Sequence, residues 1–265
     1  MRAVFYHDLA QYGLPFVTPR DPDYSGLINE LRRQWPVSDL NDEAFEDAAV
    51  LLNQSGKTVV ATTVLWTYYP ATGDSRSSID ASFASTAVFD EMGRNGSTLT
   101  AGSRRLITWQ GTFGWNSDVK PPAVRSGPSL GWVFRRTPPR RDIEDVEGIE
   151  VQLDSAFFDD GLCVGPDQWG TFGGVLAAIA EERRLVDQIL SRLRAGGTAV
   201  DVFAILRPLT IQRTPPPVSA AGLGPSLLHG FAFAAMHHVT HWDDQRLTDW
   251  FSEIAARQKL HLRRA

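Results

Sequence analysis

The chain has 265 residues, of which 43% are hydrophobic and 22% charged, a composition typical of a globular protein with a sizeable core. Its formal net charge of −5 disfavours wholesale nucleic-acid binding. Cys163 is the only cysteine, which excludes an intrachain disulfide, and we expect it to be buried like a small hydrophobic residue.

The first 44 residues predict an irregular leader with one short helix. Three prolines interrupt Met1–Asp23, which we expect to be irregular, and a short helix is expected over Gly26–Gln34, closed by Pro36. Met1–Gly13 has no continuous apolar run, so we expect no signal peptide.

Runs of β-branched and aromatic residues predict strands from residue 45 onward. Ala48–Leu52 and Thr58–Tyr69 are expected to form an antiparallel pair joined by a polar turn. Both faces of Thr58–Tyr69 carry apolar side chains, so this strand should be central and covered on both sides. Further strands are expected at Ile79–Phe89, Arg104–Trp115 and Leu130–Phe134.

The segment Gly148–Ala195 predicts a strand, a hairpin and a long helix in succession. Alternating apolar and polar residues indicate a half-buried strand over Gly148–Phe158, and Asp159–Gly161 is typical of a tight, solvated turn. Asp167 is expected to cap the next helix. Apolar residues at three- and four-residue steps predict that this helix runs over Gln168–Arg194 and lies across a sheet face.

Within Asp154–Asp167 the chain reads Asp-Ser-Ala-Phe-Phe-Asp-Asp-Gly and then Val-Gly-Pro-Asp. This segment resembles one found in uncharacterised bacterial proteins of no assigned function. The resemblance implies a bacterial origin and carries no implication for activity.

The C-terminal part predicts a strand, a linker and a helical segment. Ala199–Leu206 is apolar with two valines and is expected to be a strand. Pro215–Pro217 is stiff and extended, and Val218–Pro225 is expected to continue as a linker. Leu227–Leu260 is expected to be mainly helical, with basic residues at the C-terminal end of the helix.

Together these elements predict a mainly-β protein with an α layer, an α+β fold. We expect a leader over 1–44, an antiparallel β-sandwich over 45–214 that carries the helix at 168–194, and a proline linker with a C-terminal helical segment over 215–265.

One histidine cluster is the candidate for metal chemistry. His237 and His241 lie four residues apart, so on a helix they share a face and can bind one ion together. Asp243 or Asp244 can add an oxygen ligand or orient an imidazole. The pattern lacks the Glu that follows the first His in metalloprotease helices. The alternative interpretation makes Asp243 or Asp244 a helix N-cap, with the histidines at a polar boundary.

The eight tryptophans are the second candidate feature. Trp115, at the edge of a loop, is expected to be the most exposed and to stack on a sugar or on a protein partner. The alternative is that the tryptophans in predicted strands fill the core, because aromatic side chains bury large areas.

The sequence shows no convergent set of acid, base and nucleophile. We therefore expect a non-catalytic binding or assembly module of a soluble bacterial protein, with a protein partner or self-association, no nucleic acid and no cofactor. The alternative is a metal-dependent enzyme with a divalent transition metal such as zinc at His237, His241 and a nearby Asp. The longest apolar run, Leu227–Met236, is too short to cross a bilayer, so we expect no membrane span and a cytoplasmic location.

Overall fold

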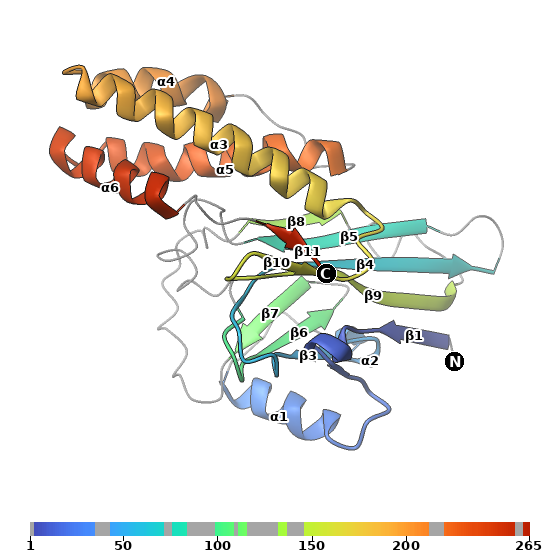
Figure 1. Ribbon diagram of the computed structural model, residues 1–265. Helices are drawn as coiled ribbons and strands as arrows, with labels where there is room; N and C mark the ends of the chain where they lie inside the picture. Colours follow the sequence, from blue (N-terminus) through green and yellow to red (C-terminus); the bar gives the residue numbers. More distant parts are fainter. Residues whose placement is uncertain are drawn as a thin grey trace.

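The computed structural model describes residues 3–34, 43–71, 76–83, 99–108, 111–115, 132–136, 146–211, 220–257 and 262–265. Their architecture is mixed α/β, with two separate sheets that do not close into a barrel. From top to bottom, Figure 1 shows a helical bundle, a larger sheet, a smaller sheet and helix α1 (Tyr24–Gln34). The expected combination of sheet and helix is confirmed at this level.

The larger sheet has β9 and β4 at its centre. The described part of this sheet contains β1 (Ala3–His7), β4 (Val59–Pro70), β5 (Arg76–Phe83), β8 (Trp132–Arg136), β9 (Val146–Phe158), β10 (Leu162–Val164) and β11 (Arg263–Arg264). The order is β11-β10-β9-β4-β5-β8, and β1 pairs in parallel with the first half of β9. The pairs of β4 with β5 and with β9 are antiparallel.

The smaller sheet is packed between the larger sheet and α1. Its antiparallel order is β2 (Phe16–Val17), β3 (Ala49–Leu52), β6 (Arg104–Thr108) and β7 (Gly111–Trp115). Val50 and Leu106 pack on α1 and on the short helix α2 (Glu43–Glu46). Leu51 and Ile107 point the opposite way and share one core with Trp66 of the larger sheet. Alternation along the strands thus buries both faces of this sheet.

The strand β4 is central and covered on both faces, as its sequence predicts. Val64 and Trp66 belong to the core between the sheets. Val60 and Ala61 belong to a second core, which they form with α3 (Thr171–Arg194) and α5 (Ala220–Val239). Cys163 lies in that second core at 1% exposure, as expected, and burial raises the pKa of its thiol to about 12.

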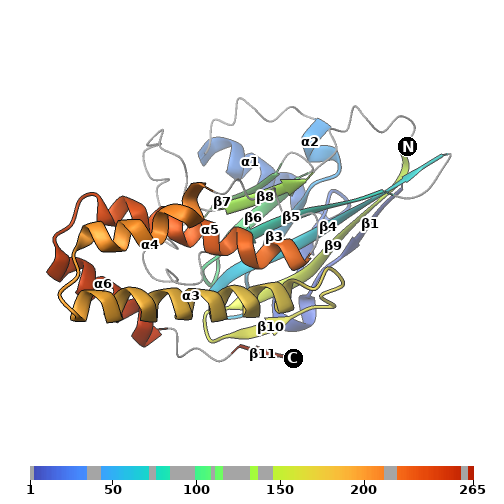
Figure 2. The same cartoon turned by 90° about the horizontal axis from the view of Figure 1, so that it is seen from above.

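Four helices form the bundle above the larger sheet: α3, α4 (Ala199–Ile211), α5 and α6 (Asp244–Arg257). Figure 2, seen from above, shows α3 extending from the sheet to the far end of the bundle. Its first half packs on the sheet through Val175 and Ile179, and its second half joins the bundle core through Val186 and Ile189. One helix therefore connects the sheet to the bundle.

A buried carboxylate fixes the start of α3 on the sheet. Asp154 is the extra residue of a β-bulge in β9, where the pairing with β4 shifts by one residue. Its side chain is fully buried and accepts hydrogen bonds from the backbone amides of Gln168 (2.7 Å) and Trp169 (3.2 Å). Burial raises the pKa of Asp154 above its ordinary value, and the two amide hydrogen bonds oppose that shift.

Asp167 continues this junction into the helix. Its amide donates to the Asp154 carbonyl oxygen at 2.9 Å, and its carboxylate accepts a hydrogen bond from the Phe172 amide at 3.1 Å. The helix begins at Thr171 with Gly170 as its N-cap, so the expected start at Gln168 with Asp167 as N-cap is wrong, although the Asp167 carboxylate still accepts an amide of the first turn. Gly165 has φ +112°, and a Cβ there would collide with the Asp154 carbonyl oxygen, so the turn requires glycine.

The expected strand at Ala199–Leu206 is wrong, because this segment is the first part of helix α4. Val202 and Leu206 lie four residues apart and are completely buried in the bundle core. The Ala199 amide donates to Asp244 Oδ1 at 2.6 Å, which caps the start of α4 from another helix. Tertiary packing therefore overrides the strand propensity of the valines.

Five further expectations need correction. Ala48–Leu52 and Thr58–Tyr69 do not form the expected antiparallel pair, because β3 lies in the smaller sheet, between β2 and β6, and β4 lies in the larger sheet, between β5 and β9. Arg104–Trp115 is a hairpin of two strands, β6 and β7, with Thr108 paired to Gly111. Met1–Asp23 is not wholly irregular, since it supplies β1, β2 and the 3₁₀ helix η1 (Ala10–Tyr12). Helix α5 begins inside the expected linker and contains Pro225. Arg263–Arg264 is the strand β11, paired with β10, and not a helix terminus.

Replacing Asp154 by alanine should lower the free energy of unfolding by about 3 kcal/mol. Two backbone amides lose their acceptor, and a hydrogen bond to a charged group contributes about 1.5–3 kcal/mol. Urea denaturation followed by circular dichroism measures the change. The matched control is Asp159→Ala in the exposed turn of the same hairpin, which should shift stability by less than about 0.5 kcal/mol. Equal midpoints for Asp154→Ala and the native chain would contradict the role of Asp154.

Candidate functional site

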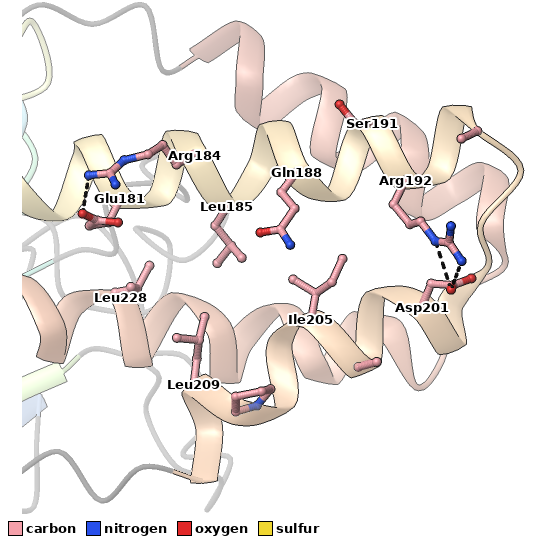
Figure 3. Close-up of a pocket in the computed structure, with 13 residues that line it drawn as sticks. Glu181, Arg184, Leu185, Gln188, Ser191, Arg192, Asp201, Ile205, Leu209 and Leu228 are labelled. Carbon is pink, nitrogen blue, oxygen red and sulfur yellow. Dashed lines mark hydrogen bonds and ion pairs between the residues drawn. The ribbon is translucent and has the colours of Figure 1, made fainter.

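A groove of about 1050 Å³ lies between α3, α4 and α5. Figure 3 shows its walls, with α3 on one side and α4 on the other. The floor is apolar and consists of Leu185, Ile205, Leu209 and Leu228, one or more from each of the three helices. All four side chains also contribute to the bundle core, so the groove is an opening onto that core.

The α3 wall of the groove is polar. Glu181, Arg184, Gln188 and Ser191 line it at three- and four-residue steps, which places them on one face of the helix. All four are exposed. Leu185 lies beside this face at the boundary with the buried side of α3, where the groove reaches its floor.

An ion pair marks each end of the groove in Figure 3. Arg184 pairs with Glu181 at one end. At the other end the Arg192 guanidinium reaches from α3 to α4, where its Nε and Nη2 donate to Asp201 Oδ1 at 3.0 and 2.6 Å. Asp201 also accepts the Thr198 amide at 2.8 Å, and this amide bond, followed by Arg192, lowers its pKa.

The α4 wall of the groove rises to an exposed apolar crest. Val200, Ala204, Pro208 and Ile211 are spaced by four, four and three residues, so they lie on one stripe of the helix. Val200 is 76% exposed and Ile211 is 64% exposed. Ala204 and Pro208 also line the groove. Hence α4 is apolar both towards the bundle core and towards solvent. We call these four residues the α4 crest.

No protein-family model, curated protein or solved structure matches the chain. Function is therefore argued from the geometry and chemistry of the described residues. Among these residues no helix has both the length and the apolar character that a bilayer crossing requires.

His237 in the last turn of α5 and His241 in the turn that follows the helix lie close together, although the two do not share one helix as expected. Their ring centroids are 4.6 Å apart, and both side chains are exposed. His241 Nδ1 lies 2.7 Å from the His237 carbonyl oxygen and 2.8 Å from Thr240 Oγ1. These contacts occupy Nδ1 and leave Nε2 of His241 as the nitrogen available to an ion.

The two candidate aspartates are engaged at helix starts. Asp243 Oδ1 accepts the Arg246 amide at 2.8 Å, which makes Asp243 the N-cap of α6. Asp244 Oδ1 accepts the Ala199 amide of α4 at 2.6 Å. In the part of the chain that the structure describes, no group of three or more His, Cys, Asp or Glu is placed to hold a metal ion. Metal binding at His237 and His241 stays a prediction.

His238 differs from its two neighbours because it faces the bundle. Its ring lies 4.0 Å from the Trp242 ring and 4.6 Å from the Trp250 ring, centroid to centroid. Burial, and then the nearby His237, Arg246 and His241, lowers the pKa of His238 to about 4. Neutral His238 is therefore part of an aromatic cluster at the end of the bundle.

Trp115 is the last residue of β7 and pairs with Arg104. Its side chain lies outside what the structure describes, so ligand contact by Trp115 stays a prediction. Trp66, by contrast, is 1% exposed in the core between the sheets.

The groove was not predicted from the sequence. A signal for it was present in α4, where Val202 and Leu206 share one helical face and the α4 crest occupies the opposite one. When this segment is interpreted as a strand, the two opposite faces of the α4 helix are not recognised. The α3 wall gives no such signal, because a polar helix face is typical of any surface helix.

Stability should fall with decreasing pH because of His238. The unfolded chain takes up a proton near pH 6.5, whereas the folded chain resists protonation down to about pH 4. The stability that neutral His238 contributes is thus present in full above pH 6.5 and is lost progressively as the pH falls from 6.5 to about 4.

Urea unfolding at several pH values, compared between the native chain and His238→Phe, measures this loss. The phenylalanine keeps an aromatic ring at this position and removes the titration. Between pH 4 and 6.5 the free energy of unfolding of the variant should depend less steeply on pH, by the slope that the uptake of one proton contributes. His7→Gln on the larger sheet, remote from the bundle, is the control. If the free energy of unfolding had the same pH dependence in the native chain and in His238→Phe, His238 would not be the titrating group.

Proposed function

We propose that the chain is a non-catalytic binding or assembly module that docks a protein surface on the face formed by α3 and α4. The observation that carries the proposal is the apolar groove between these helices, continuous with the exposed α4 crest. The exposed side chains of Val200 and Ile211 add no stability to a monomer. Exposed apolar surface next to a concave site is characteristic of interaction surfaces.

The charges around the groove support docking over catalysis. Arg184 is paired with Glu181, and Arg192 with Asp201. The pKa of Asp201 is lowered, which keeps this carboxylate ionised and unsuited to act as an acid near neutral pH. A rim of paired charges around an apolar floor resembles the polar rim and apolar centre of a protein interface.

Three further expectations accompany this proposal. The two sheets, which share one core, act as a β-sandwich platform that supports the bundle. The net charge of −5 favours a protein partner over a nucleic acid. Cys163 is a buried free thiol, and free thiols are typical of cytoplasmic proteins, so we expect the chain to act in the cytoplasm.

The accessible apolar floor should bind 8-anilinonaphthalene-1-sulfonate, a dye that fluoresces on exposed hydrophobic surface. The folded chain at low concentration is expected to bind the dye at one principal site. Ile205→Lys, which places a charge in the floor, should weaken binding by about tenfold, or ~1.4 kcal/mol. Fluorescence titration measures the affinity, and far-UV circular dichroism confirms that the variant is folded.

Leu176→Lys is the matched control for the dye experiment. Leu176 is an exposed leucine of α3 that does not line the groove, so its replacement should leave dye binding unchanged. Absence of dye binding to the native chain, or equal binding to Ile205→Lys, would count against a docking groove.

A second candidate function, a metal-dependent enzyme, is favoured by one observation: the two exposed imidazoles of His237 and His241 lie 4.6 Å apart. Elemental mass spectrometry of tag-free protein tests it. The binding-module proposal expects far less than one zinc, iron or manganese per chain, unchanged in His237→Ala. One metal ion per chain that is lost in His237→Ala would favour the enzyme.

A further inference from the structure

We propose that the face formed by α3 and α4 binds a second copy of this chain in a two-fold dimer, with α4 antiparallel to α4 of the other copy. This inference rests on the proposed function and names the partner of that docking face. It is carried by the α4 crest, by the arrangement of charges along the groove and by the size of the face.

The α4 crest has the shape that a self-complementary contact needs. Large side chains, Val200 and Ile211, stand at its two ends, and the small or flat Ala204 and Pro208 lie between them. When two such crests meet antiparallel about a two-fold axis between Ala204 and Pro208, Val200 of each copy lies near Ile211 of the other. The small central residues let the two helices approach closely.

The charges of the groove suit the same arrangement. A two-fold axis perpendicular to α4 exchanges the ends of the groove, so the Arg192–Asp201 end of one copy lies against the Glu181–Arg184 end of the other. Each end carries one acid and one base, so no block of like charge opposes the contact. The Arg184–Glu181 pair of one copy then lies beside the Arg192–Asp201 pair of the other, so acids and bases can alternate across the contact in this orientation.

The size of the face predicts a weak dimer. A helix of 13 residues such as α4 is about 20 Å long, and two neighbouring helices are about 20 Å wide, so the face covers roughly 400 Å² per copy. Stable complexes bury about 800 Å² per partner. A reversible dimer that forms with increasing protein concentration is therefore expected.

Sedimentation equilibrium of the full chain tests the dimer. The apparent mass should rise with concentration for the native chain, and Val200→Glu should raise the dissociation constant about tenfold or more, because it brings a charge into the contact. Val200 lies in the first turn of α4, where the helix dipole favours an acid, so the variant should remain folded. Leu176→Glu, off the face, is the control and should dimerise like the native chain.

A pair of double variants tests the antiparallel register. In Val200→Glu with Ile211→Lys, the new acid of each copy lies near the new base of the other, so association should be largely restored. In Val200→Glu with Ile211→Glu, like charges meet and the protein should be monomeric. If the helices did not meet in this register, both double variants would associate equally poorly. That result would overturn the antiparallel dimer.

A single cysteine tests the two-fold symmetry directly. Ala204→Cys places a thiol near its own symmetry copy, so a short bismaleimide crosslinker should give a covalent dimer. The native Cys163 is buried and its pKa is raised, so it should not react. Leu176→Cys is the control and should stay monomeric under the same treatment.

The outcomes separate this inference from the proposed function. A native chain that stays monomeric at its highest soluble concentration, yet binds the dye in an Ile205-dependent way, overturns the self-association and retains a docking face for another protein. A monomeric chain without dye binding overturns both. Dimerisation that Val200→Glu abolishes and Leu176→Glu does not, with the Ala204→Cys crosslink, supports the dimer.

Discussion

The buried carboxylate of Asp154 is the contact on which the arrangement of sheet and bundle depends. It joins a bulge in the central strand β9 to the backbone amides of Gln168 and Trp169, just before α3 begins. A second polar contact, Thr63 Oγ1 to Thr171 Oγ1 at 3.0 Å, holds the first residue of α3 on β4. Asp154, Thr63 and Thr171 are fully buried, so each of these side chains is costly to leave unpaired, which confines the helix to one starting position.

Because the start of α3 is held on the sheet, the helix also fixes where the groove lies. Its 24 residues extend about 36 Å, from the core on the sheet to the end of the bundle. The polar wall of the groove is a face of this same helix, and Arg192 ties it to α4 through Asp201. The docking face that we propose is thus built on helices held in fixed positions, which would lower the entropic cost of binding a partner.

Three acidic side chains of the bundle accept hydrogen bonds from backbone amides. Asp243 caps its own helix, Asp244 caps α4 from another helix, and Asp201 joins the Thr198 amide to Arg192. A sequence cannot distinguish such a cap from a metal ligand, because both need a carboxylate near a helix start. For Asp244 the role is decided by α4, whose first amide lies 45 positions away in the chain.

By itself the sequence determined what short-range periodicity and turn chemistry encode: the β4 strand covered on both sides, the β9–β10 hairpin and the α3 helix. The tertiary structure alone decided that Ala199–Leu206 is helical, that β1 and β11 join the larger sheet and that α3 and α4 enclose a groove. The physical reason is the separation along the chain over which each kind of interaction acts. Alternation and helical spacing act over a few residues, whereas α4 becomes a helix because a bundle core and a distant cap are available to it, and a groove exists only between helices that have already packed.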